Sequence, residues 1–133
     1  MVKPQAHELQ VLHAEICAAM ADPTRIAIIY ELADGPRNVS EIVAALGLNQ
    51  TTASRHLRFL RDRGMVSTDR QGQNVYYALV DTRVIQALDL MRSVLADVVS
   101  RRQALVSGTG FRDSGAGEMP AAIAASESRI SIP

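Results

Sequence analysis

Residues 49–64 read NQTTASRHLRFLRDRG, and this stretch decides the fold. It opens with Asn49, a residue type preferred at helix N-caps, and closes with Gly64, a type preferred just past a helix end. Between them Ala53, Leu57 and Leu60 recur at helical spacing, which predicts a helix with one apolar face. The remaining face is polar and basic and consists of Gln50, Thr51, Ser54, Arg55, Arg58 and Arg61.

The polar face of this predicted helix has the chemistry of a surface that reads DNA. Arg and Gln side chains hydrogen-bond to base edges in the major groove, whereas Thr and Ser bind phosphates. A solvated surface helix is the alternative, because runs of charge usually face solvent. The charge distribution favours DNA: residues 50–75 hold five Arg against two Asp, although the formal net charge of the whole chain is zero.

Two predicted helices precede this one. Asp22 and Pro23 suit the N-cap and the first position of a helix over about 23–33. Asn38 and Glu41 have the spacing of a capping box, which predicts a short helix that ends at Gly47. Two short helices joined by a tight turn that contains Gly form a helix-turn-helix, and its second helix is the one with the polar face, as DNA reading requires.

A β-hairpin is predicted directly after the helix-turn-helix. Residues 65–68 and 74–80 are rich in β-formers, and the polar segment 69–73 between them contains Gly72 for a turn. A hairpin in this position is a wing. Arg70 and Gln73 near its tip are candidates for contact with the DNA backbone or the neighbouring minor groove, and an ordinary exposed hairpin tip is the alternative.

The first and last predicted helices carry apolar stripes that indicate a dimer. On the last helix the stripe consists of Leu88, Met91, Leu95 and Val98, at alternating steps of three and four. On the first helix, over about 6–20, it consists of Leu9, Leu12 and Ile16. The stripe of the last helix is widened beyond what packing on one small neighbour needs by Ile85, Leu90, Val94 and Val99. This width predicts a partner subunit, and two-fold DNA half-sites favour the same arrangement; a self-contained core is the alternative.

Composition and length predict a mainly α (α+β) protein with an aliphatic core. The 133 residues are 47% hydrophobic but only 4% aromatic. We expect about five helices and a two-stranded hairpin in one domain over 6–106, with a flexible lead over 1–5 and a disordered tail over 107–133. Neither a signal peptide nor a membrane span is predicted, and the single Cys17 excludes an internal disulfide, so we expect a cytoplasmic protein.

Four segments together resemble the ArsR/SmtB family of bacterial winged helix-turn-helix transcriptional repressors. They are ADPTR at 21–25, SEI with the following LGL within 40–48, QTTASRHL at 50–57 and VYY at 75–77, and the resemblance covers about residues 9–102. It implies a homodimer joined through its first and last helices. It also implies a repressor that holds double-stranded DNA, at an imperfect palindromic operator, until an inducer binds.

By matching position, the resemblance implies that Gln50, Thr51, Ser54 and Arg55 are the principal DNA contacts. His56 also lies in this motif, but its direction on the helix places it nearer the core side, so we expect it to be mainly structural. The whole set of candidate DNA contacts, with the rest of the helix face and the hairpin, is Gln50, Thr51, Thr52, Ser54, Arg55, Arg58, Arg70 and Gln73.

The inducer is not indicated by the residues that many family members use to bind metals. The helix over 39–46 has neither Cys nor His, and the last helix has no His. His13 and Cys17 remain: they are four residues apart on the first helix and would supply part of a site for a transition-metal or thiophilic ion. A packed thiol beside a half-exposed imidazole is the alternative. The cofactor therefore stays open.

Three classes of function compete at this point. A sequence-specific DNA-binding repressor is favoured by the helix-turn-helix, the hairpin and the charge distribution. A winged helix that serves only protein interaction is the alternative. An enzyme is disfavoured, because the sequence has no paired catalytic carboxylates in a plausible cleft, no nucleophile elbow and no phosphate-binding Gly loop.

Overall fold

The structure is a computed structural model that describes residues 1–108. In chain order its elements are α1 (Ala6–Leu12), the π-helical segment η1 (His13–Cys17), α2 (Pro23–Glu31), the 3₁₀ turn η2 (Leu32–Asp34), β1 (Arg37–Asn38), α3 (Val39–Leu46), α4 (Gln50–Asp62), β2 (Val66–Gln71), β3 (Asn74–Leu79) and α5 (Arg83–Gly108). They fall into two units: Met1–Thr82, which we call the winged unit, and the part from Arg83 onward, which contains α5.

Helices α2, α3 and α4 begin at the caps that the sequence predicts. Asp22 Oδ1 accepts hydrogen bonds from the backbone N–H of Thr24 at 2.8 Å and of Arg25 at 3.2 Å, with Pro23 at the first helical position. Asn38 and Glu41 form a reciprocal capping box at the start of α3. These side chains satisfy backbone donors that a helix start leaves without intrahelical partners.

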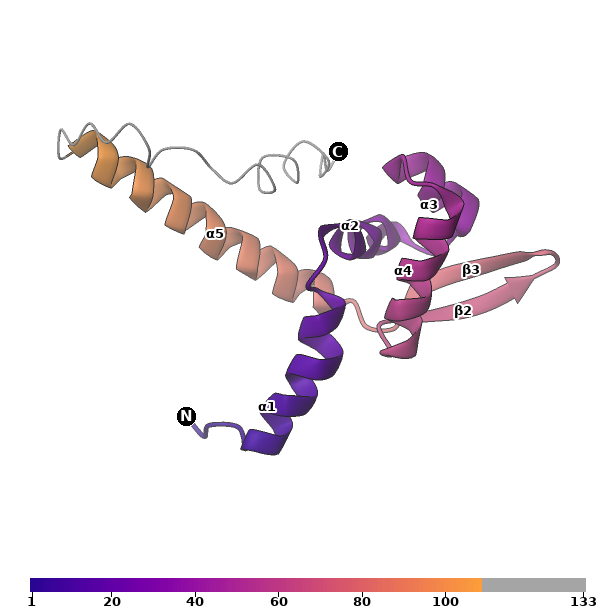
Figure 1. Cartoon of the computed structure of the whole chain (residues 1–133), viewed down its shortest axis with the longest axis horizontal. Coiled ribbons are helices and arrows are strands. Elements are labelled where there is room, and N and C mark those ends of the chain that lie inside the picture. The colour runs from indigo at the N-terminus through magenta and orange to yellow at the C-terminus, as the bar shows by residue number, and fades with distance from the viewer. Residues whose placement is uncertain (109–133) are drawn as a thin grey trace. The chain divides into compact units, whose positions relative to one another are not determined.

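The turn between α3 and α4 is fixed by a glycine and a cap. Gly47 has a left-handed backbone with φ of 63°, and the N–H of Leu48 then donates to the carbonyl of Val43. Two residues later Asn49 caps α4 by accepting from the N–H of Thr52 at 2.7 Å. Because this turn is short, α3 and α4 pack against each other as a helix-turn-helix (Figure 1).

The core of the winged unit is aliphatic and lies among α2, α3 and α4. The largest fully buried side chains are Ile28, Ile29, Ile42, Leu57 and Leu60. Ala53, Leu57 and Leu60 form the predicted stripe of α4 and are all fully buried. Full burial of one such Leu side chain contributes roughly 1.5–3 kcal/mol, so the stripe anchors α4 on the other two helices.

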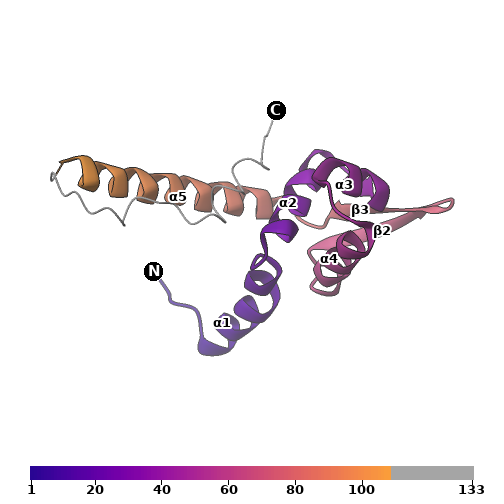
Figure 2. The ribbon, with the colours of Figure 1, turned by 45° about the horizontal axis from the view of Figure 1, so that its top comes forward.

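The sheet has three antiparallel strands in the order β1-β3-β2: the expected two-stranded hairpin is β2–β3, and β1 adds a third strand that the sequence did not predict. Arg37 and Asn38 of β1 pair with Tyr77 and Tyr76 of β3. A strand of two residues has no alternating pattern in the sequence, so only pairing with β3 in the folded chain reveals it. Figures 1 and 2 show the β2–β3 hairpin extending past α3 and α4.

The hairpin turn is shorter than the predicted segment 69–73. Register pairs Gln71 with Asn74, so the turn holds only Gly72 and Gln73, and Gly72 has φ of 64°. Two-residue hairpin turns need such a backbone because its twist matches that of the strands. Arg70 consequently belongs to strand β2, whereas Gln73 lies in the turn.

The first helix is helical over the predicted range but not uniformly α. It changes to a π-helical segment at His13–Cys17 before it ends near Ala19. At the other end of the described chain, α5 is one helix of 26 residues. Of the expected tail, 109–133 lie outside the described residues, and Ser107 and Gly108 belong to α5.

Candidate nucleic-acid interface

The face of α4 opposite its buried stripe is exposed along its length. Gln50, Thr51, Ser54, Arg55 and Arg58 are exposed, and Thr52, whose backbone N–H donates to the Asn49 cap, is half-buried. Within residues 1–108 no side-chain hydrogen bond engages Arg55 or Arg58. From the first to the last of these residues the helix rises about 12 Å, close to the width of the DNA major groove.

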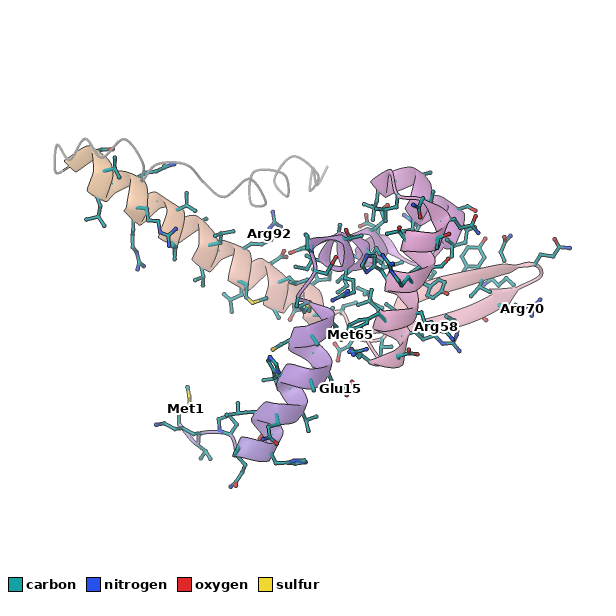
Figure 3. All side chains as sticks on the ribbon, in the orientation of Figure 1. Met1, Glu15, Arg58, Met65, Arg70 and Arg92 are labelled. Atoms are coloured by element: carbon teal, nitrogen blue, oxygen red, sulfur yellow. The ribbon has the colours of Figure 1, made fainter. Side chains whose placement is uncertain are left out.

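The hairpin carries two further polar candidates. Arg70 and Gln73 are both exposed, and Arg70 Nε donates to the carbonyl of Gly72 at 3.3 Å. Figure 3 shows Arg70 toward the tip of the hairpin and Arg58 on α4, nearer the hairpin base. Since α4 packs against β2, the helix face and the hairpin belong to one unit and can be presented together.

His56 lies on the side of α4 that faces α2, as its predicted structural role requires. Its Nδ1 is 3.3 Å from Nη1 of Arg25. Desolvation by burial lowers the pKa of His56, with smaller effects from Asp22, which raises it, and from Arg25 and Arg55, which lower it. Guanidinium groups only donate, so Nδ1 accepts this bond and the contact requires the neutral imidazole.

Two side chains at this junction were not among the predicted functional residues. Arg25 also donates to the carbonyls of Ala18 and Ala19, and it stacks on the Phe59 ring. A cation three residues past a helix cap, directly after the end of another helix, is the signal that could have revealed it. The guanidinium of Arg63 also lies over the Phe59 ring, with its Cζ 3.5 Å from the ring centre.

Comparison with known proteins agrees with this geometry. Residues 22–68 match the family described as "Bacterial regulatory protein, arsR family". The chain is 41% identical over 76 residues to the transcriptional regulator NmtR of Mycobacterium tuberculosis, which covers 57% of this chain and 63% of NmtR. It is 40% identical over 84 residues to the regulator CmtR of Mycobacterium bovis, covering 62% of this chain and 71% of CmtR.

A solved structure gives the same result. The homodimeric winged helix-turn-helix DNA-binding domain of a Mycobacterium bovis protein superposes with a TM-score of 0.62 at 30% identity. The superposition covers 76% of this chain and 95% of that domain. The chain belongs to the arsR family. Membership places it among DNA-binding transcriptional regulators and not among enzymes, and it confirms the winged helix-turn-helix fold.

Both stripes predicted for an arsR-type dimer have exposed members. On the first helix Leu9, Leu12 and Ile16 are 47%, 45% and 38% exposed. On α5 Met91 and Leu95 are 55% and 39% exposed and Val98 is half-buried, whereas Leu88 is buried. Large apolar side chains at this exposure are consistent with a partner surface, and their place in a dimer stays a prediction.

His13 and Cys17, the candidate metal ligands, are both exposed on η1. Among residues 1–108 no group of three or more His, Cys, Asp or Glu side chains is placed to hold a metal ion. The pair therefore offers two ligands of the four that a tetrahedral site needs. Across the same residues no helix is long and apolar enough to cross a membrane.

Proposed function

We propose that this arsR-family protein is a homodimeric, cytoplasmic repressor that holds an imperfect palindromic operator with α4 in the major groove. The observation that supports this most is the two-sided character of α4. Ala53, Leu57 and Leu60 are fully buried on one side, and exposed Gln, Thr, Ser and Arg side chains occupy the other. A helix anchored in this way presents its polar side chains to a groove without losing its own packing.

Within this proposal the side chains of α4 and the hairpin have different roles. Gln50 and Arg55 read base edges, because amide and guanidinium groups can form paired hydrogen bonds with adenine and guanine. Thr51, Thr52, Ser54 and Arg58 bind the sugar-phosphate backbone beside them. Arg70 and Gln73 contact the backbone or the minor groove from the hairpin.

The dimer follows from the need for two reading helices. The exposed stripe of the first helix and that of α5 supply apolar surface for a second copy, and one apolar stripe on each of two copies can form a two-fold interface. Two copies of α4 would then meet half-sites about 34–36 Å apart, which is one turn of DNA. The homodimeric domain from Mycobacterium bovis supports this assembly.

The test is binding of labelled DNA from upstream of the protein's own gene, measured by fluorescence anisotropy against a scrambled duplex of equal length. We expect tighter binding to the upstream DNA, with an affinity that falls steeply between 50 and 200 mM salt, by roughly 10³-fold or more for six phosphate contacts. Equal binding to both duplexes at physiological salt would favour the protein-interaction alternative.

His13 and Cys17 are the residues that we propose for a signal that releases DNA. One pair from each subunit would supply two imidazoles and two thiolates, the ligand set of a tetrahedral zinc site. Adding zinc, nickel, cadmium or arsenite to the operator complex should then lower the anisotropy, and Cys17→Ser or His13→Ala should abolish the response. If wild type and both variants respond alike, the signal is sensed elsewhere.

A further inference from the structure

Arg25, in the first turn of α2, joins two helices of the winged unit through a single side chain. Its Nε donates to the carbonyl of Ala19 at 2.9 Å, and its Nη2 donates to the carbonyl of Ala18 at 2.9 Å. Its Nη1 lies 3.3 Å from Nδ1 of His56, and its Cζ lies 4.1 Å from the centre of the Phe59 ring. The end of the first helix is thereby tied to the middle of α4.

The first-helix side of this junction has a simple physical basis. The last carbonyls of a helix lack intrahelical partners and form the negative end of its dipole, so a cation placed there is stabilising. The Asp22 cap holds the backbone of Arg25 in place through the 3.2 Å bond to its N–H. The backbone that carries the guanidinium is therefore held by a contact within its own helix.

The α4 side of the junction lies next to the proposed reading face. His56 and Phe59 are three residues apart and so lie on the same side of α4. His56 directly follows Arg55, the exposed arginine that we place on DNA. A small shift of His56 relative to Arg25 must therefore move Arg55 as well, because both belong to one rigid turn of helix.

We propose that Arg25 is a positioning residue for DNA reading. Through its contacts it couples the position of the first helix to the position of α4. This inference rests on the proposed function, in which α4 reads DNA and the first helix takes part in the dimer. The first helix carries the exposed apolar stripe and, just before the bonded carbonyls, the pair His13 and Cys17. A change at either feature that moves Ala18 or Ala19 is then transmitted to α4.

Replacement of Arg25 separates its geometry from its charge. Arg25→Lys keeps the charge but loses the planar fork that serves two carbonyls and a ring nitrogen at once. Arg25→Gln loses both. We expect each variant to bind the operator about tenfold more weakly, a loss of roughly 1.4 kcal/mol, while Arg25→Lys binds scrambled DNA as wild type does. Operator affinity of Arg25→Lys equal to that of wild type would overturn the proposal.

A pair of variants at His56 gives a test that does not depend on Arg25 itself. Asn carries an acceptor oxygen near the position of Nδ1, so His56→Asn can keep the bond, whereas His56→Leu cannot. We expect His56→Asn to retain operator affinity within about twofold and His56→Leu to lose about tenfold. The double variant of Arg25→Gln and His56→Leu should lose no more than either single variant, because both remove the same coupling.

The outcomes distinguish this proposal from the proposed function. If the wild type fails to prefer operator over scrambled DNA, the proposed function itself is wrong. If the wild type does prefer it, and the losses at Arg25 and His56 add independently, only the coupling is wrong. Thermal unfolding and sedimentation of every variant establish that folded dimers are compared, and the His56 pair decides the matter if Arg25 variants do not fold.

Discussion

At the scale of the residue, the polar side chains of α4 differ in what they face: some are exposed, and others contact the neighbouring helix α2. The side chains of Arg55 and Arg58 are exposed and make no hydrogen bond within residues 1–108, whereas the His56 ring lies against Arg25. The position of His56 on the helix already distinguishes it from its neighbours in the sequence. Its partner is not evident there, because Arg25 is 31 residues away along the chain.

The depressed pKa of His56 makes stability depend on pH. The folded-state pKa lies below the ordinary 6.5, mainly through desolvation, so the folded state disfavours the protonated imidazole. The contribution of His56 is therefore fully present above pH 6.5 and is lost as the pH falls through the folded-state value. Denaturant melts of wild type and His56→Asn over pH 4.5–7.5 should diverge at the acid end, with a flatter profile for the variant.

Parallel profiles for the two proteins would contradict this assignment. His7 and His13 are present in both proteins, so the two proteins differ only at position 56. The difference between the profiles then reports His56 alone.

Two arginines should affect DNA binding in different ways. Arg55→Ala removes the base contact that we propose, so we expect it to cost about 1–3 kcal/mol on the operator and to relax specificity. Arg70→Ala removes the proposed backbone contact, so it should weaken operator and scrambled DNA alike and reduce the salt slope by about one. Anisotropy titrations over a salt series measure both quantities.

The matched control is Arg92→Ala, since Arg92 lies on α5, pairs with Asp89 at 3.3 Å and is 46% exposed (Figure 3). It removes the same charge from a helix outside the winged unit. A loss of specificity as large as that of Arg55→Ala would show that charge, and not base reading, explains the effect.

At the scale of the element, the helix-turn-helix depends on short-range signals that act at its ends. Asn38, Asn49 and Asp22 cap three helices, and Gly47 supplies the left-handed residue between two of them. These features act over a few residues, and the sequence therefore located the helices closely. The strand β1 was missed because its two residues are defined by a partner in β3.

The Asn49 cap can be tested by itself. Asn49→Ala leaves the N–H of Thr52 without its acceptor, and we expect a loss of about 1 kcal/mol in the free energy of unfolding. Asn49→Asp keeps an acceptor oxygen at the same position and should restore most of this stability. Urea melts followed by circular dichroism give both values, and equal stability of the Ala and Asp variants would exclude a capping role.

At the scale of the whole molecule, apolar surface on the first helix and on α5 indicates that a single copy is incomplete. Leu90, Met91 and Val94 are each more than half exposed. Large exposed apolar patches mark sites where a partner binds. The winged unit carries one copy of α4, the helix that we propose reads DNA, and the proposed dimer would supply a second copy.

Charge on the α5 stripe should break the dimer. Leu95→Glu places a carboxylate where we propose a buried apolar contact, so sedimentation should show monomers and operator affinity should fall by more than tenfold, because only one half-site can be held. Ser93→Glu, at an exposed position on the opposite side of α5, is the control and should remain dimeric. A dimeric Leu95→Glu variant would place the interface elsewhere.

The sequence by itself determined the helices, their caps, the hairpin and the two-sided character of α4, because these depend on residue periodicity and on contacts within a few positions. Only the tertiary structure decided the third strand, the two-residue turn that moves Arg70 into β2, and the junction at Arg25. The third strand and the junction need two segments far apart in the chain to meet, and the turn depends on the register in which β2 pairs with β3. Local sequence patterns do not specify which segments contact each other. Strand pairing and helix packing in the folded chain determine these contacts.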